Sequence, residues 1–436
     1  MVMPGPDPAP RLAGVIPSRW RRITVGILRR RGALALALCS AACGGDGGWA
    51  EPEIGGEHRP TQLLLELALG EDFEASREYQ LSWMKAIEVG EDGTLWVLDG
   101  EGHSSLLRQF DPAGRYLRTV GGVGEGPGEF RDPAALALLS DGRLALRDRT
   151  APDRLTVYAA NGSHVATWRI PEWGDRGGGG SFAVAADTGD VVWVRFQGFR
   201  RPTGPRHLRP PPVLVRLGPD GAVLDTVPTP TTPDVPRDSL RIVRTSSGGG
   251  VSILGIGVPY QPRGGWRLSP SGAFAVYRTD QYRVEIFPPV GLLEAEGHSS
   301  LAVPSLVITR DVEPVPVSEA ERRALRRIME EEVERAGSPR GVRIPEVPRF
   351  KPPIKDVRFG LDGRVWVSVS IPGVFRDGRW VDPEAYDVFD PQGAFLGRVL
   401  IPEGLTLGKS RGHHLWGRFF GEHGVESVRR YRILWN

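Results

Sequence analysis

The sequence predicts an all-β fold made of repeated four-stranded antiparallel sheets. Two stretches with the same plan support this: residues 87–120 and 135–168 each hold four apolar runs separated by turns, and their first turns lie 49 residues apart. Asp-Gly and Asn-Gly pairs at these turns predict type I′ hairpins, in which both central residues have positive φ. One such sheet cannot bury both faces alone, so the repeat predicts a β-propeller in which the sheets pack together as blades.

The same plan recurs along the chain. The predicted blades are residues 87–120, 135–168, 191–227, 265–287, 354–399 and 405–434. The last blade ends after its third strand, whereas residues 62–69 (QLLLELAL) form a strand without a hairpin of its own. Pairing of residues 62–69 as the outermost strand of the last blade would close the ring and leave no open edge. We therefore predict a six-bladed propeller over residues 61–436.

A glycine-rich link joins the first two blades. It reads Gly-x-Gly-Glu-Gly-Pro-Gly-Glu-Phe over residues 122–130 and is followed by Asp132-Pro133. With the repeats, this link resembles the bacterial six-bladed β-propeller family, close to the NHL-repeat propellers of the TolB-like/NHL superfamily. The resemblance covers nearly all of the chain after its leader. It implies the fold, but not one chemistry, because such propellers include lyases, lactonase-like enzymes and interaction scaffolds.

One helix is predicted between blades four and five, within a helical insertion over residues 317–337. Ser318-Glu-Ala-Glu321 is a capping box, apolar residues follow at helical spacing, and Gly337 marks the end. The helix is interpreted as a brace packed over the ring, with a mobile lid or docking helix as the alternative.

Tight turns and long insertions are expected on opposite faces of the ring. Glycine turns join the first to the second strand and the third to the fourth strand of each blade. The insertions are assigned to the other face: residues 195–212, 228–263, 370–384 and the helix. Long loops gathered on one face favour a ligand or partner surface there.

Three tryptophans occupy corresponding positions in the second strands of their blades: Trp96, Trp193 and Trp366. Their repetition at one structural position predicts packing between blades, not a surface on which sugars stack.

Catalytic motifs are sparse. The chain has no Gly-x-Ser-x-Gly elbow, His-Glu-x-x-His pair, Walker loop or cysteine-based metal spacing. The candidates for catalysis are Asp99, Glu101 and His103, which follow the second strand of blade one at the channel mouth. They could hold Ca²⁺ or Zn²⁺ with ligands from other blades. The alternative is that Asp99 forms a turn, and on that interpretation no metal or cofactor is expected.

Candidates for ligand binding lie at equivalent places in other blades. They are Arg147, Asp148, Arg195, Arg200, Arg201, Arg278, Asp280, Arg418 and His423. Planar guanidinium forks favour a carboxylate or phosphate ligand. Ordinary surface ion pairs are the alternative explanation for these charges.

Residues 1–42 are interpreted as a signal peptide, with a basic region, a short apolar run and small residues before Cys43. Small residues leading into Cys43 and a glycine-rich sequence after it resemble a bacterial lipobox, which implies lipidation of Cys43. The alternative is an ordinary signal peptide, with Cys43 as a bystander. Residues 43–60 are expected to be a flexible tether.

Removal of the leader changes the charge. It takes away seven arginines and one aspartate, so 48 basic and 52 acidic residues remain and the formal charge changes from +2 to −4. A mildly negative domain does not favour nucleic-acid binding.

The sequence is compatible with two functions. The leading hypothesis is a lipid-anchored, non-enzymatic propeller outside the cytoplasm, in the periplasm or at the cell surface, which binds a protein or small ligand through its insertion-rich face. The alternative is a metal-dependent lyase or lactonase-like hydrolase with its site at the channel mouth.

Overall fold

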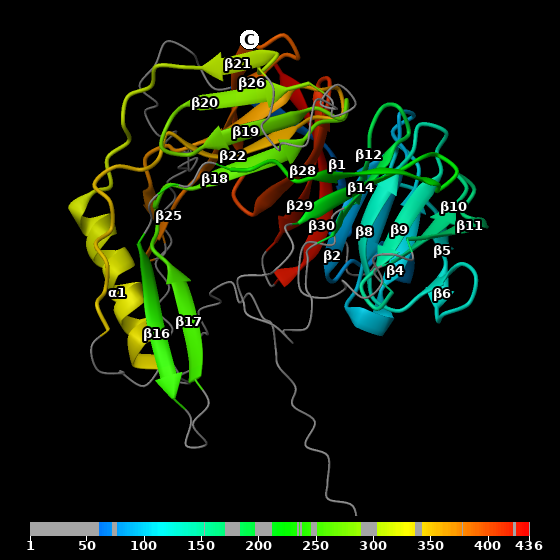
Figure 1. The fold of residues 1–436 in the computed structure, drawn as a ribbon, viewed down its shortest axis with the longest axis horizontal. Coiled ribbons are helices and arrows are strands. Elements are labelled where there is room, and N and C mark those ends of the chain that lie inside the picture. Colours follow the sequence, from blue (N-terminus) through cyan, green and yellow to red (C-terminus); the bar gives the residue numbers. More distant parts are fainter. Residues whose placement is uncertain are drawn as a thin grey trace, which may run out of the picture. The chain divides into compact units, whose positions relative to one another are not determined.

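Six four-stranded antiparallel sheets form a six-bladed β-propeller, which confirms the predicted fold class (Figure 1). All six belong to one compact unit, Pro52–Asn436. The computed structural model describes residues 61–71, 76–151, 153–170, 184–196, 212–232, 235, 238–245, 251–288, 303–335, 342–376, 378–421 and 424–435.

The strands of each blade follow the chain from the inner to the outer edge, apart from the last blade. Blade one contains β2 (Met84–Val89), β3 (Leu95–Asp99), β4 (Leu106–Phe110) and β5 (Tyr116–Val120); blade two contains β8 (Pro133–Leu138), β9 (Leu144–Asp148), β10 (Arg154–Tyr158) and β11 (His164–Arg169). Blade three contains β12 (Val184–Ala186), β13 (Val192–Phe196), β14 (Val213–Leu217) and β15 (Val223–Pro228); blade four contains β18 (Gly264–Leu268), β19 (Phe274–Arg278), β20 (Arg283–Phe287) and β21 (Leu306–Thr309). Blade five contains β22 (Ile354–Phe359), β23 (Val365–Val369), β26 (Glu384–Phe389) and β27 (Phe395–Ile401); blade six contains β28 (Leu405–Arg411), β29 (His414–Phe420), β30 (Glu426–Leu434) and β1 (Gln62–Leu69).

The core lies between blades. A separate apolar cluster fills each of the six interfaces, including the one between blade six and blade one. The three repeated tryptophans belong to these clusters, as predicted. Trp96 packs against blade two and Trp366 against blade six, while Trp193 meets Phe274 of blade four edge-on, with ring centroids 5.9 Å apart. Burial of these rings removes large apolar areas from water and fixes the spacing of neighbouring sheets.

The N-terminal strand closes the ring, as predicted. β1 pairs antiparallel with β30 from Gln62 opposite Leu434 to Leu69 opposite Val428, with a bulge between Leu65 and Leu67. Leu69 is buried in the interface between blade six and blade one. Blade six therefore takes its outer strand from the opposite end of the described chain.

The hairpin turns differ from the prediction in type. At Asp92-Gly93, Gly93 has φ +85°, whereas Asp92 is not among the residues with positive φ. Gly93 N–H donates to Gly90 O and Gly90 N–H donates to Thr94 O, so a type I turn is followed by one left-handed glycine. The Asp92 carboxylate accepts the Thr94 N–H at 2.9 Å, which explains why Asp or Asn precedes the glycine. The expectation of type I′ turns was therefore wrong.

Two of the insertions contain hairpins that the sequence analysis did not identify. These are β16 (Ser239–Thr245) with β17 (Val251–Gly257), and β24 (Val374–Arg376) with β25 (Arg379–Val381). The glycine-rich link contains a short parallel pair, β6 (Gly122–Val123) and β7 (Glu129–Phe130). Two short 3-10 helices, η1 (Arg77–Tyr79) and η2 (Gly102–Ser104), complete the elements of blade one.

The predicted helix is present as α1 (Glu319–Arg335) and lies alongside the β16–β17 hairpin (Figure 1). Met329 from α1 packs with Leu240 and Ile242 from β16 in a cluster separate from the blade interfaces. Ser318 Oγ accepts the Glu321 N–H at 3.1 Å, which is one half of the predicted capping box. The Glu321 side chain is instead buried in contacts with other segments, described below.

One connection contradicts the assignment of every long insertion to a single face. The fourth strand of blade four, β21, begins at Leu306, although β20 ends at Phe287. This third-to-fourth connection belongs by topology to the face of the tight glycine turns. The other long insertions join second to third strands or successive blades, and they share the opposite face.

Several predicted features lie outside the described residues: the signal peptide (1–42), Cys43, the tether (43–60) and Gly337. In the part of the chain that is described, no helix combines the length and apolar character needed to cross a membrane.

Candidate functional site

The predicted site residues gather where second strands end and inner strands begin, on the insertion-rich face. Asp99 ends β3 opposite Met84, the first residue of inner strand β2. Asp148 ends β9 opposite Pro133, the first residue of inner strand β8. The two aspartates therefore occupy the same position in blades one and two.

Asp99 uses its carboxylate to hold the segment that enters blade one. Its Oδ1 accepts the N–H groups of Ser82 at 3.0 Å and Trp83 at 2.7 Å, and its Oδ2 lies 3.1 Å from Nη1 of Arg108. The residue is 3% exposed. Both oxygens therefore have partners from the protein itself, and these partners lie 9 to 17 residues away in the chain, not in a turn at Asp99.

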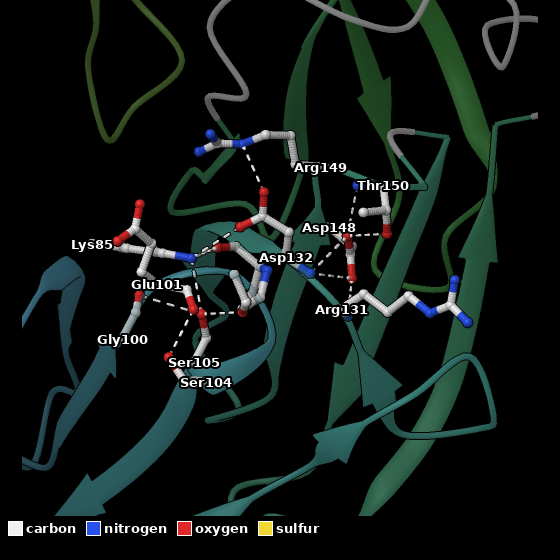
Figure 2. A network of polar contacts seen from close by, with 12 residues as sticks. Lys85, Gly100, Glu101, Ser104, Ser105, Arg131, Asp132, Asp148, Arg149 and Thr150 are labelled. Atoms are coloured by element: carbon white, nitrogen blue, oxygen red, sulfur yellow. Dashed lines mark hydrogen bonds and ion pairs between the residues drawn. The ribbon is translucent and has the colours of Figure 1, made fainter. Parts of the chain in front are cut away.

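Asp148 does the same in blade two. Its carboxylate accepts the Arg131 N–H at 2.6 Å and both the N–H and the hydroxyl of Thr150 at 2.7 Å (Figure 2). Burial raises the pKa of this carboxyl, but the hydrogen bonds from Thr150 and Arg131 outweigh burial, so the pKa lies below its usual value. Asp148 is thus an ionised anchor of the link between blades.

Glu101 and His103 do not join Asp99 in a cluster of known geometry. Glu101 is exposed, and its backbone oxygen accepts the hydroxyl of Ser104 at 2.7 Å. The side chain of His103 lies outside the described structure. Among the side chains that the structure does describe, no three or more His, Cys, Asp or Glu groups come together as a metal site. The Asp99 carboxylate in particular faces Arg108 and two backbone N–H groups, which does not fit a metal ligand.

Two of the predicted ligand-binding arginines connect neighbouring blades. Arg147 donates from Nη1 to the backbone oxygen of Arg195 at 2.7 Å, and burial lowers its pKa to about 10 although Asp153 opposes the shift. Arg418 donates from Nη1 to the Met84 oxygen at 2.7 Å. Both guanidinium groups therefore hold the next blade.

Arg278 and Asp280 form a surface ion pair at 2.6 Å. Their mutual hydrogen bond raises the pKa of Arg278 and lowers that of Asp280. Arg200, Arg201 and His423 lie outside the described residues.

A lysine that the sequence analysis missed lies between blades one and two. Nζ of Lys85 donates to Ser105 Oγ at 2.9 Å, Asp132 Oδ1 at 3.0 Å and Pro133 O at 3.1 Å (Figure 2). Lys85 occupies a bulge in inner strand β2, and Lys355 occupies the matching bulge in β22 of blade five. An alignment of the inner strands, Met84-Lys85-Ala86 with Ile354-Lys355-Asp356, could have found both lysines.

A second missed cluster joins blade five to the insertions. Lys351 has a fully buried side chain and lies 3.1 Å from Glu321 and 2.7 Å from Asp382. Tyr260 donates its hydroxyl to Glu321 Oε1 at 2.7 Å and has a φ of 60°, which is strained for a residue other than glycine. Lys355 lies 3.8 Å from Asp382; burial lowers its pKa, and the neighbouring carboxylates oppose that shift.

Comparison with known proteins supports no family assignment. No protein-family model and no curated protein sequence matches the chain. Solved structures with a similar arrangement include a member of the DUF4221 family from Bacteroides vulgatus ATCC 8482, at 10% identity, with 87% of this chain and 99% of that chain covered and a TM-score of 0.46.

Two further similar structures are an exported-protein candidate from Bacteroides fragilis NCTC 9343 and virginiamycin B lyase from Staphylococcus aureus. The first is 10% identical, with 85% of this chain and 95% of that chain covered and a TM-score of 0.42. The second is 10% identical, with 85% of this chain and 99% of that chain covered and a TM-score of 0.38. At this identity and similarity, the functions of these proteins carry no argument for the present chain.

Inner strands of adjacent blades are joined by charged side chains around the channel. Arg267 of β18 lies 2.5 Å from Asp356 of β22, and Lys409 of β28 lies 2.8 Å from Glu88 of β2. Tyr277 also donates to Asp356 at 2.5 Å. These charges are partly exposed, and the contacts pair them across the boundaries between blades.

Proposed function

We propose that this chain is an extracytoplasmic, lipid-anchored propeller that acts as a binding module for a protein or small ligand through its insertion-rich face. The observation that carries the proposal is the position of exposed aromatic residues. Trp83, Phe350 and Phe375 are 55%, 55% and 58% exposed, and they are the large exposed aromatic side chains of the described residues.

All three lie in connections of one face. Trp83 precedes inner strand β2, Phe350 precedes inner strand β22, and Phe375 belongs to β24 between the second and third strands of blade five. Exposed aromatic side chains are common at the centres of protein interfaces because they bury large areas with little loss of conformational freedom. Their restriction to the face with the long insertions supports a binding surface there.

The polar groups at the channel mouth favour binding over catalysis. A hydrolase or lyase needs an acid, a base or a metal with free coordination sites. Asp99 and Asp148, the two described carboxylates at the second-strand ends of blades one and two, are occupied by backbone N–H groups and by Arg108 or Thr150. This occupancy supports a structural role for both.

The leader supports the location. The basic and apolar segments of residues 1–42, followed by Cys43 and a glycine-rich tether, are typical of an exported lipoprotein. An acylated Cys43 would place the propeller outside the cytoplasm on a membrane surface.

Site-specific photo-cross-linking in the native host tests the binding surface. A photoreactive amino acid is placed at Trp83, Phe350 or Phe375, and matched controls carry it at Leu117 or Leu224, which are exposed on outer strands of blades one and three. We expect a discrete adduct at one or more aromatic positions and none at the controls. Absence of adducts at all three aromatic positions, or equal adducts at the controls, would contradict the proposal.

A further inference from the structure

Side chains at one equivalent position of the second strand form hydrogen bonds with the next blade. Arg147 in β9 donates to the Arg195 backbone oxygen and lies over the Phe196 ring, with Cζ 4.5 Å from the ring centroid. Tyr277 in β19 donates to Asp356, and Arg418 in β29 donates to the Met84 oxygen. Each of these polar groups therefore finds an acceptor in the adjacent blade.

Arg195 occupies this position in β13 of blade three but has no such acceptor. Its guanidinium lies over the Trp266 ring of blade four, with Cζ 5.3 Å from the ring centroid. Its Nε is buried without a hydrogen-bond partner. In the described structure no carboxylate forms an ion pair with Arg195. Arg147, Tyr277 and Arg418 each have an acceptor in the next blade, whereas Arg195 at the equivalent position has none among the described residues.

Burial and a neighbouring cation both act on Arg195. Burial, followed by repulsion from Arg267, lowers the pKa of Arg195. Asp356, which could offset this charge, is already paired with Arg267 and Tyr277. A guanidinium that is partly removed from water and faces another cation is stabilised by an anion.

We infer that Arg195, whose guanidinium lies over the ring of Trp266, is the anchor of a binding site for an oxyanion, either a carboxylate or a phosphate group of a small ligand. A guanidinium presents a planar fork of N–H groups that matches two oxygens of such a group. Arg195 lies near the end of β13 that leads into the insertion-rich face. The inference thus rests on the proposed binding function, since the ligand would enter from that face.

Anion titration of the purified full chain tests this site without any partner. Inorganic phosphate and acetate are titrated separately at constant ionic strength, with calorimetric detection of binding. The variants are Arg195→Met, which keeps the length of the side chain without its charge, and Arg326→Met as a matched control at the exposed ion pair with Glu330 on α1. We expect saturable binding of at least one anion to the wild type, at least tenfold weaker binding to Arg195→Met and unchanged binding to Arg326→Met.

Thermal unfolding without either anion gives a second, independent readout. We expect the Tm of Arg195→Met to equal or exceed that of the wild type, because a partly buried charge without an ion pair in the described structure is removed. Arg147→Met should lower the Tm by breaking its bond to blade three. A fall in Tm as large as that of Arg147→Met would make Arg195 a structural residue and overturn the inference. So would the absence of saturable binding to the wild type, or equal binding to Arg195→Met. Because the cross-linking test uses other residues and a native partner, its outcome separates failure of the proposed function from failure of this site.

Discussion

Glu321 of α1 and Lys351 of the segment before blade five form a buried ion pair with an N–O distance of 3.1 Å, and their side chains are 3% and 0% exposed. Glu321 also accepts the Tyr260 hydroxyl, and Lys351 also donates to Asp382 and to the Ile371 backbone oxygen. Segments of three insertions, which contain Tyr260, α1 and Asp382, therefore meet at these two charges. Such a pair contributes little net stability compared with apolar packing, but loss of one partner leaves an uncompensated charge in the interior.

We therefore predict that Lys351→Met destabilises the protein by about 3–5 kcal/mol, because Glu321 would remain buried without its cation. The free energy of unfolding is measured with denaturant. Arg326→Met is the matched control, since its pair with Glu330 is exposed and should contribute less than about 0.5 kcal/mol. The double variant Glu321→Leu with Lys351→Met should recover part of the loss. A loss below about 1 kcal/mol in Lys351→Met alone would contradict the prediction, because the pair would then not be isolated from water as its burial indicates.

The second prediction concerns closure of the ring by β1. A chain that begins at Glu71 lacks the strand that covers β30, and it should unfold at a lower temperature than a chain that begins at Glu51. Removal of β1 exposes the edge of β30 and opens the cover over Ile433, which is fully buried. Equal Tm values for the two chains, compared by calorimetry, would show that β1 is dispensable.

Much of the fold could be predicted because its signals are local. A glycine at each turn, such as Gly93, marks a left-handed position that other residues rarely adopt, and apolar runs of strand length flank it. The error in turn type arose because Asp-Gly pairs occur both in type I′ turns and at the end of a type I turn. The fourth strand of blade four was missed because β21 is separated from β20 by a long connection.

The partners within the site were less predictable, because they come from distant parts of the chain. Lys85 meets Asp132 of the next blade, and Tyr260 meets Glu321 across the helical insertion. Strand patterns give the face on which a residue lies, but not the residue it meets in another sheet. Asp99 illustrates the limit: its place at a strand end was predicted, while its bonds to Ser82 and Trp83 required the structure.

Asp148 makes a prediction about acid stability. Its pKa in the folded state lies below its ordinary value of 3.8, so the unfolded state binds more protons and stability rises with pH through this range. The contribution is complete above the unfolded pKa and is lost as the pH falls through the folded pKa. Asp148→Asn should lower the free energy of unfolding by about 1.5–3 kcal/mol at neutral pH, and its stability should fall less steeply below about pH 4.

Denaturant unfolding of Asp148→Asn and wild type at several pH values measures this difference. Glu101→Gln is the control at an exposed carboxylate without an ion pair in the described structure, and it should leave the acid limb unchanged. Equal steepness in Asp148→Asn and wild type would show that Asp148 does not contribute to acid sensitivity.

Lipidation at Cys43 is a further prediction. Cys43→Ala should abolish labelling by a fatty-acid precursor and release the protein from membranes, because each buried CH₂ of an acyl chain contributes about 0.8 kcal/mol to membrane binding. Cys39→Ala is the matched control, since Cys39 lies within the predicted leader and its loss should leave labelling intact. Labelling and membrane retention that persist in Cys43→Ala would rule out the lipid anchor at this residue.

Substitution of Asp99 distinguishes a structural carboxylate from a metal ligand. Because Asp99 joins Ser82, Trp83 and Arg108, Asp99→Asn should lower the free energy of unfolding by about 1–3 kcal/mol, whether or not divalent ions are present. Excess EDTA should leave the Tm of the wild type unchanged, because a ligand that binds only the folded state would stabilise it and its removal would lower the Tm. The two measurements together decide between the interpretations. If EDTA lowers the wild-type Tm to that of Asp99→Asn and has no effect on the variant, Asp99 holds a metal. That result would favour the metal-dependent enzyme over the binding module.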